Sequence, residues 1–231
     1  MKSSARPVRG FDRYRLIDIA IRVALGVFYA FSAGANYRVV ISQGHSIDFA
    51  HLTIENISHI LSTLSIGFYA IMVAFLYVLR LRPVNKFAGV WPAIAAVLGG
   101  FLMYGVLWLK PRMDLPPSVQ IMASLLILGG NIFAIYILTH LGKSFSILPE
   151  GRQLVTKGPY KIVRHPLYVA EAFAVLGTMI LFLSPAAVGL VIVQMALQLW
   201  RIHYEELVLR KTFPEYKKYA QRTARLIPGV Y

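Results

Sequence analysis

The chain has 231 residues, of which 57% are apolar and only 15% are charged, and its formal net charge at pH 7 is +14. Soluble domains are about half apolar and about a quarter charged, so this composition indicates a membrane protein. The chain has no cysteine, which excludes disulfides, thiolate nucleophiles and cysteine-ligated metals. The basic residues lie in the gaps between apolar runs, and no soluble basic module is present, which argues against nucleic acid as a partner.

Six apolar stretches follow one another, and a membrane span needs about 20 such residues. The first stretch has no small-residue cleavage site close behind it, so we expect a retained transmembrane helix. Proline is tolerated in the first turn of a helix, and Ser184-Pro185 interrupts the last apolar run, so the final two stretches predict a helical hairpin. The expected spans cover about Leu16–Ile41, Ile54–Leu79, Phe87–Leu109, Ser118–Thr139, Pro166–Leu183 and Ala186–Leu199.

Basic residues gather in every second gap between these spans. Segments Met1–Arg15, Arg80–Lys86, Leu141–His165 and Arg201–Tyr231 hold 20 of the 24 lysines and arginines. Six spans place these segments on one side of the membrane, which the positive-inside rule assigns to the cytoplasm. The sequence therefore predicts an all-α integral membrane protein of about six transmembrane helices with both termini cytoplasmic. We expect it in a bacterial inner membrane, with anionic lipids as partners.

The loop between the fourth and fifth spans is polar. Gly142 stands where a helix C-cap is expected, Gly158-Pro159-Tyr160 signals a turn, and Arg164-His165 comes just before Pro166. Histidine is a plausible acid, base or donor near neutral pH. The structural alternative is that Arg164 only anchors the topology and His165 caps the following helix.

A polar stripe marks the last span. Gln194, Gln198, Arg201 and Glu205 are spaced by 4, 3 and 4 residues, so they share one helix face. Glutamines facing lipid are costly, so the stripe should face the bundle or a wet cavity. The structural alternative is a hydrogen-bonded seam that ends in an Arg201–Glu205 ion pair. Glu171 in the preceding helix is either functional or simply pairs with Arg201.

These motifs together resemble the isoprenylcysteine carboxyl methyltransferase and phospholipid methyltransferase family. The resemblance runs from about Leu141 to the C-terminus, and residues 1–140 match only a generic transmembrane helical bundle. It divides the chain into that bundle, 1–140, and a methyltransferase-like region, 141–231, with a cofactor loop, the hairpin and a cytoplasmic tail. The motifs are Leu141-Gly-Lys-Ser-Phe-Ser146, Leu154-Val-Thr-Lys-Gly-Pro-Tyr160, Arg164-His-Pro-Leu-Tyr168 and Arg201-x-x-x-Glu205-Glu206.

The resemblance implies methyl transfer from S-adenosylmethionine in a pocket that faces the cytoplasm. It assigns Arg201 to the methyl acceptor and implies catalytic roles for Arg201, Glu205 and His165, with no metal. Arg152 departs from the histidine that some family members carry at this place. The residues implied to contact the cofactor are Gln153, Leu154, Val155, Tyr160, His165, Pro166, Leu167, Tyr168 and Glu205.

The residue chemistry agrees with this implication. Methyl transfer from a sulfonium needs neither a metal nor a covalent intermediate, so alignment in a dry site would supply most of the catalysis. Arg201 could hold a carboxylate or a lipid phosphate on a lipophilic acceptor that enters from the bilayer. A prenylated-cysteine carboxylate, a phospholipid amine and another hydrophobic small molecule all stay open, so the transfer is to oxygen or to nitrogen.

Two other functions stay open. One is an NADPH-dependent reductase of an isoprenoid or sterol double bond, whose family has a related C-terminal hairpin. The other is a non-catalytic transporter that uses the stripe from Gln194 to Glu205 as a polar pathway. The C-terminal tail, Lys211–Tyr231, predicts a short amphipathic helix or a purely electrostatic anchor at the membrane surface.

Overall fold

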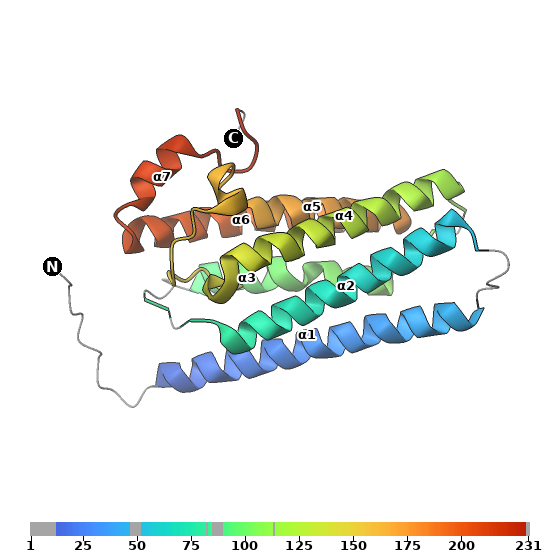
Figure 1. The fold of residues 1–231 in the computed structure, drawn as a ribbon, viewed down its shortest axis with the longest axis horizontal. Coiled ribbons are helices and arrows are strands. Elements are labelled where there is room, and N and C mark those ends of the chain that lie inside the picture. Colours follow the sequence, from blue (N-terminus) through green and yellow to red (C-terminus); the bar gives the residue numbers. More distant parts are fainter. Residues whose placement is uncertain (1–12, 47–51, 82, 85–89, 113, 230–231) are drawn as a thin grey trace.

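A computed structural model describes residues 13–46, 52–81, 83–84, 90–112 and 114–229. This part of the chain forms α-helices and short 3-10 segments, with one isolated β-bridge between Val163 and Ala224 and no strand. The long helices run roughly along one axis, and a short helix lies across one end (Figure 1). The predicted all-α architecture is confirmed for the described residues.

Most helix bounds lie close to the predicted spans, but α6 continues to Thr212, well beyond the predicted end at Leu199. Helix α3 continues into the 3-10 segment η2, and two further 3-10 turns, η3 and η4, lie in the polar loop. The helices are α1 (Arg13–Ser46), α2 (Ile54–Leu79), α3 (Val90–Phe101) with η2 (Leu102–Trp108), α4 (Pro117–Leu141), α5 (Pro166–Leu181), α6 (Pro185–Thr212) and α7 (Tyr216–Arg222); the turns are η3 (Gly142–Ser144) and η4 (Gly158–Lys161).

Five helical segments are long and apolar enough to cross a membrane: α1, α2, α3 with η2, α4 and α6. Helix α5 has only 16 residues and is a shorter apolar helix, so the sixth span stays a prediction. The N-terminal basic segment lies mostly in residues 1–12, outside the described residues, and the cytoplasmic placement of both termini also stays a prediction.

Local chemistry explains where several helices begin and end. The side-chain oxygens of Thr53 and Ser184 accept backbone N–H bonds in the first turns of α2 and α6. Pro166 opens α5, where its missing N–H costs nothing. Gly142 ends α4 with a φ of 52°, a backbone conformation that favours glycine, so the predicted C-cap is confirmed.

Small residues let α4 and α5 pack closely. A Cβ on Gly130 would lie 2.7 Å from the backbone nitrogen of Ala174, and a Cβ on Gly177 would lie 2.5 Å from the carbonyl of Ala123. Close backbone approach of this kind is a common basis of helix association in membranes. The prediction of a close approach holds for Gly130, whereas Gly129 faces open space.

The two arms of the predicted hairpin pack mainly against other helices. Helix α5 packs chiefly on α4 and α6 chiefly on α3, and these contacts exceed those between α5 and α6 themselves. Helix α1 packs on α2, which in turn packs on α4. Helices α5 and α6 therefore form separate walls of the bundle.

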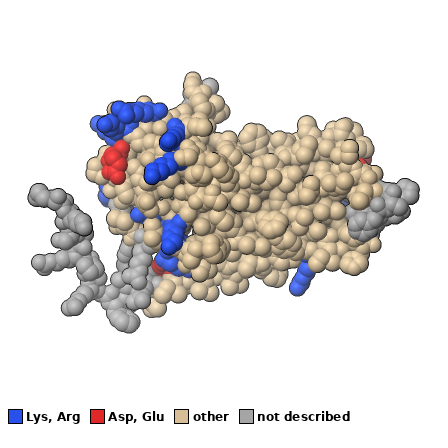
Figure 2. All heavy atoms as spheres, in the orientation of Figure 1, with Lys and Arg blue, Asp and Glu red and all other residues tan. Residues whose placement is uncertain are grey.

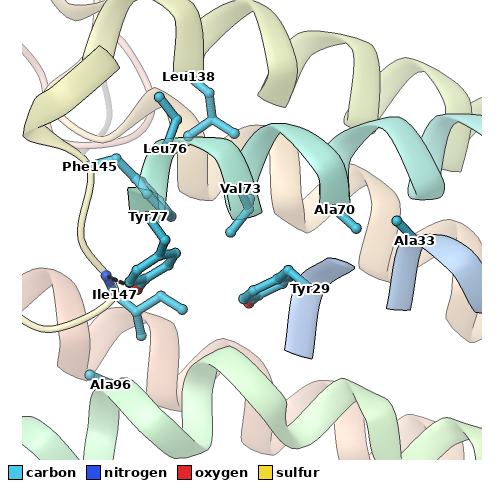
Figure 3. Packing of buried hydrophobic residues seen from close by; sticks show 10 residues of the cluster. All are labelled: Tyr29, Ala33, Ala70, Val73, Leu76, Tyr77, Ala96, Leu138, Phe145 and Ile147. Atoms are coloured by element: carbon cyan, nitrogen blue, oxygen red, sulfur yellow. Dashed lines mark hydrogen bonds between the residues drawn. The ribbon is translucent and has the colours of Figure 1, made fainter. Parts of the chain in front are cut away.

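A buried cluster joins the first four helices to the polar loop (Figure 3). At its centre Tyr77 of α2 is fully buried, and its hydroxyl accepts a hydrogen bond of 3.0 Å from the backbone N–H of Ile147. The N-terminal helices thus fix the position of the loop. The buried members are Tyr29, Ala33, Ala70, Val73, Leu76, Tyr77, Ala96, Leu138, Phe145 and Ile147.

A charged cluster forms a second set of contacts between α1, α2 and the same loop. Asp18 accepts hydrogen bonds from Arg22 at 2.7 Å and from Arg80 at 2.6 Å. Arg152 of the loop lies 3.8 Å from Asp18 and is also ion-paired with Glu150. Burial lowers the pKa of Arg80, and the carboxylate of Asp18 opposes this effect.

Charge is concentrated at one end of the molecule. On the face shown in Figure 2, lysine and arginine side chains gather at the end that carries α7, and the long flank is largely free of charge. The exposed side chains along the flanks include many large apolar residues, such as Val27, Phe31 and Phe75. This distribution is the one expected for helices with lipid-facing sides.

Candidate functional site

A cavity of about 280 Å³ lies within the bundle, with side chains from α1 to α7 and from the polar loop along its walls. The structure brings almost all of the predicted site residues to this one cavity. Pro166 is the exception, because it is fully buried in the first turn of α5. The predicted residues along the cavity are Gln153, Leu154, Val155, Tyr160, His165, Leu167, Tyr168, Arg201 and Glu205.

The Gly-Pro-Tyr turn forms one wall, as the 3-10 turn η4. Gly158 has a φ of 60°, and a Cβ there would lie 2.3 Å from the ring of His140. The hydroxyl of Tyr219, in α7, donates a hydrogen bond of 2.6 Å to the carbonyl of Tyr160. Burial raises the pKa of Tyr219 to about 12, so this donor keeps its proton near neutral pH. The tail helix therefore covers the turn.

Glu206 is the centre of an ion-pair network next to the cavity. Its carboxylate is nearly fully buried and accepts a hydrogen bond of 2.8 Å from Arg164. The ring of His165 lies 3.3 Å away, and Arg210 and Arg225 lie 3.4 Å and 3.3 Å away. The network joins the start of α5 to the end of α6 and to the tail.

This network corrects two structural alternatives. Arg164 is tied to Glu206 and to the carbonyls of Ala220 and Thr223, so it is more than a topology anchor. His165 occupies the N-cap position of α5, but its side chain makes no capping hydrogen bond. The role of Glu206 was missed from the sequence, although a second carboxylate directly after Glu205 among so many arginines was a signal.

Glu205 lies against the cavity in a different environment. One carboxylate oxygen accepts a hydrogen bond from the hydroxyl of Tyr168, and the other lies 3.8 Å from Nδ1 of His165. Its side chain keeps 24% of its surface exposed. Among the described residues no lysine or arginine nitrogen lies within 4 Å of it. Burial, and after it the charge of Glu205, raises the pKa of the nearby Tyr160.

Arg201 is buried and makes no ion pair with a described carboxylate. Its guanidinium lies over the ring of Tyr168, with the carbon 5.1 Å from the ring centroid. It donates to the side-chain oxygen of Gln198 at 3.2 Å and to the carbonyl of Ile147 at 3.4 Å, and its buried Nε has no partner. The Arg201–Glu205 ion pair suggested as an alternative is therefore wrong.

Glu171 likewise does not pair with Arg201. Its two oxygens accept hydrogen bonds from the hydroxyl of Tyr69, at 3.0 Å, and from the amide of Gln198, at 2.8 Å. Gln194 and Gln198 are both buried, so the prediction that the polar stripe faces the bundle is confirmed.

The N-terminal helices complete the cavity. Tyr29, Tyr69, Gly99 and Tyr104 lie along it, from α1, α2, α3 and η2. A Cβ on Gly99 would lie 2.7 Å from Cδ of Arg201, so the bare backbone makes room for that side chain. These residues were missed, because tyrosines and glycines are ordinary in apolar spans and nothing local marks which face they occupy.

The fold and the cavity together define a helical protein with the spans of a multi-pass membrane protein and a ligand-sized cavity that polar and charged side chains line together with apolar ones. Within the described residues no group of three or more histidines or carboxylates could hold a metal ion. Residues 119–216 match the model of the phospholipid methyltransferase family, which confirms the resemblance predicted from the motifs. The matched region runs from the start of α4 to the start of α7 and contains all of the site residues predicted from the sequence.

Known proteins are similar to part of this chain. It is 36% identical over 80 residues to the cobalt-zinc-cadmium resistance protein CzcN of Cupriavidus metallidurans, which covers 34% of this chain and 37% of that protein. It is 34% identical over 114 residues to protein-S-isoprenylcysteine O-methyltransferase B of Arabidopsis thaliana, covering 46% of this chain and 57% of that protein. A probable protein-S-isoprenylcysteine O-methyltransferase of Oryza sativa is 33% identical over 87 residues, or 35% and 44% of the two chains. The chain thus spans 37–57% of the length of these relatives.

Proposed function

We propose that the chain is an integral membrane methyltransferase that uses S-adenosylmethionine to methylate a lipophilic acceptor. The observation that carries the proposal is the state of Glu205. This carboxylate lies along the cavity, is held by Tyr168, and has no lysine or arginine within 4 Å in the described chain. A partly buried carboxylate without a cation is costly, and a cationic ligand would offset that cost.

The residues along the cavity fit such a cofactor. S-adenosylmethionine, when bound, supplies a methyl group on a positively charged sulfonium. Glu205 would face its cationic or hydrogen-bonding groups, and Gln153, Leu154 and Val155 would line it from the loop. The ion pairs of Glu206 hold His165 and the start of α5 against α6, which keeps this half of the site in one geometry.

Arg201 would hold the acceptor. Its guanidinium is buried, stacked on Tyr168 and short of hydrogen-bond partners, which suits a carboxylate or a phosphate. The residue lies on α6, a candidate membrane span, so a lipophilic acceptor could reach it from the bilayer. We place the cavity's loop side at the cytoplasm, because the basic segments gather there. The reductase and transporter alternatives gain no support from the matches described above.

Labelled cofactor tests this proposal. The purified protein in detergent is incubated with methyl-labelled S-adenosylmethionine and a total membrane-lipid extract, and the organic phase is counted. We expect label in a lipid product, with a base-labile product indicating an ester and a base-stable one indicating transfer to nitrogen. Glu205→Gln should lose this incorporation, whereas Glu215→Gln, at an exposed position, should keep it. No incorporation together with no cofactor binding would contradict the proposal.

A further inference from the structure

Glu171 lies along the cavity on α5, one helical turn beyond Tyr168. Each of its oxygens accepts one hydrogen bond, from Tyr69 and from Gln198. An ionised carboxylate offers about four acceptor positions, so about half of its capacity is unused. A carboxylate in an apolar helix without an ion pair is expensive and by default marks function.

Arg201, on the neighbouring helix α6, has hydrogen-bond donors that the described part of the protein does not use. A guanidinium carries five N–H donors, and within the described residues only two of its nitrogens donate to the protein. Nε is buried with no partner, and the described chain offers no carboxylate within 4 Å. A positive and a negative group thus line one cavity, and each is incompletely satisfied.

Gln198 bridges Arg201 and Glu171, so the two charged groups lie in the same cavity without contacting each other directly. Its amide oxygen accepts from Arg201 at 3.2 Å, and its amide nitrogen donates to Glu171 at 2.8 Å. A direct ion pair would have neutralised both groups and closed the site. The bridging amide instead orients both groups and leaves their remaining positions open to a ligand.

The orientation of Glu171 also depends on helices outside the region that matches the methyltransferase family. Tyr69, the donor at 3.0 Å, belongs to α2, and the family match begins at residue 119. Tyr29 and Tyr104 also line the cavity, from α1 and η2. The N-terminal helices therefore help to set which ligand Glu171 accepts.

We propose that Arg201 and Glu171 bind two parts of one acceptor head group. Arg201 takes an anionic carboxylate or phosphate, and Glu171 takes a hydrogen bond from an N–H or O–H group located a few ångströms away on the same molecule. Glu171 is then a specificity-determining residue, and an anionic lipid without such a donor is a poor ligand. The inference rests on the proposed function only in calling this ligand the methyl acceptor.

Three amphiphiles with the same chain and the same carboxylate test this two-point site by direct binding. They are α-aminomyristate, α-hydroxymyristate and myristate, titrated into the full-length protein in detergent. We expect the wild type to bind at least one donor-bearing compound about tenfold or more tightly than myristate, as for a hydrogen bond to a charged group. The tighter binder of α-aminomyristate and α-hydroxymyristate shows whether Glu171 prefers an N–H or an O–H donor.

Variants test whether the preference for donor-bearing ligands depends on Glu171. Glu171→Gln should reduce the preference to within about twofold, since one of the amide's polar atoms donates instead of accepting. The affinity for myristate should not fall, because the variant removes a negative charge near the bound carboxylate. Glu171→Asp, which keeps the charge, should give an intermediate preference, and Glu215→Gln should behave as wild type. Equal affinities for the three compounds in the wild type, no binding of any of them, or a full preference in Glu171→Gln would each overturn the inference.

The same preparation separates this inference from the proposed function. S-adenosylmethionine is titrated in parallel, and Glu171→Gln should bind it like the wild type, because Glu171 lies outside the residues assigned to the cofactor. A donor preference without any cofactor binding would contradict the methyltransferase and leave the two-point site standing. Cofactor binding and methyl transfer without a donor preference would support the methyltransferase and contradict the two-point site.

Discussion

Arg201 stacks on Tyr168, with its guanidinium carbon 5.1 Å from the ring centroid, although Glu205 is only one turn further along the same helix. Tyr168 also donates a hydrogen bond to Glu205, so a single aromatic residue of α5 contacts both charged residues of α6. The arrangement keeps the carboxylate and the guanidinium from neutralising each other. It leaves Glu205 available to a cation and Arg201 available to an anion.

Replacing the guanidinium by an ammonium should impair the acceptor half of the site. Arg201→Lys keeps the charge but loses the planar stack and the paired N–H donors, so kcat/KM for the lipid acceptor should fall by about ten- to hundredfold. The affinity for S-adenosylmethionine should change by less than about twofold, as expected for a residue that binds only the acceptor. Steady-state kinetics and a cofactor titration check the two halves separately. An unchanged kcat/KM would remove Arg201 from the acceptor site.

Two adjacent carboxylates should give opposite phenotypes. Glu206→Gln breaks a buried network with Arg164, His165, Arg210 and Arg225, and a broken buried pair costs about 3–5 kcal/mol, so the unfolding temperature in detergent should drop by several degrees. Glu205→Gln should unfold at the wild-type temperature but bind the cofactor about tenfold more weakly. Thermal unfolding and titration distinguish them. The assignment fails if both variants are equally destabilised.

The family motifs and the helix ends could be predicted from the sequence because their causes are local. A glycine at the end of a helix, a proline in a first turn and a Ser-Pro break between two apolar runs act within a few residues, as at Gly142, Pro166 and Ser184. The polar stripe on α6 was found in the same way, since its spacing alone places Gln194 and Gln198 on one buried face.

The pairing of the charged residues could not be predicted in this way. Spacing shows that Glu205 is within reach of Arg201, but Tyr168 on another helix decides which contact forms. The bridge from Gln198 to Glu171 and the network around Glu206 also join helices through tertiary packing. One sequence carries no direct record of such contacts, so Glu206, Tyr69 and Gly99 were missed.

Gly99 gives a test of the N-terminal half of the chain. A Cβ there would lie 2.7 Å from Cδ of Arg201, so Gly99→Ala should displace that side chain and raise the KM for the acceptor, without a matching loss of cofactor affinity. Gly129→Ala is the matched control, because a Cβ at Gly129 meets nothing within 4 Å. In the control an alanine in a helix should stabilise the fold by about 0.5–1 kcal/mol. Wild-type acceptor kinetics in Gly99→Ala would refute the contact.

The Gly-Pro-Tyr turn should depend on glycine for two separate reasons. Gly158→Ala introduces a Cβ at a φ of 60° and places it 2.3 Å from the ring of His140. The left-handed backbone alone costs about 1–2 kcal/mol, so the variant should unfold at a lower temperature. Adding His140→Ala should relieve the clash and recover only part of the loss. Full recovery in the double variant would show that the backbone conformation is unimportant.

Binding of S-adenosylmethionine tests the central claim most directly. The purified protein in detergent is titrated calorimetrically with S-adenosylmethionine and, in a separate experiment, with NADPH. We predict saturable binding of S-adenosylmethionine at one site, about tenfold weaker in Glu205→Gln and of wild-type strength in Glu215→Gln, with no binding of NADPH. Binding of NADPH, or no binding of S-adenosylmethionine by the folded protein, would contradict the account.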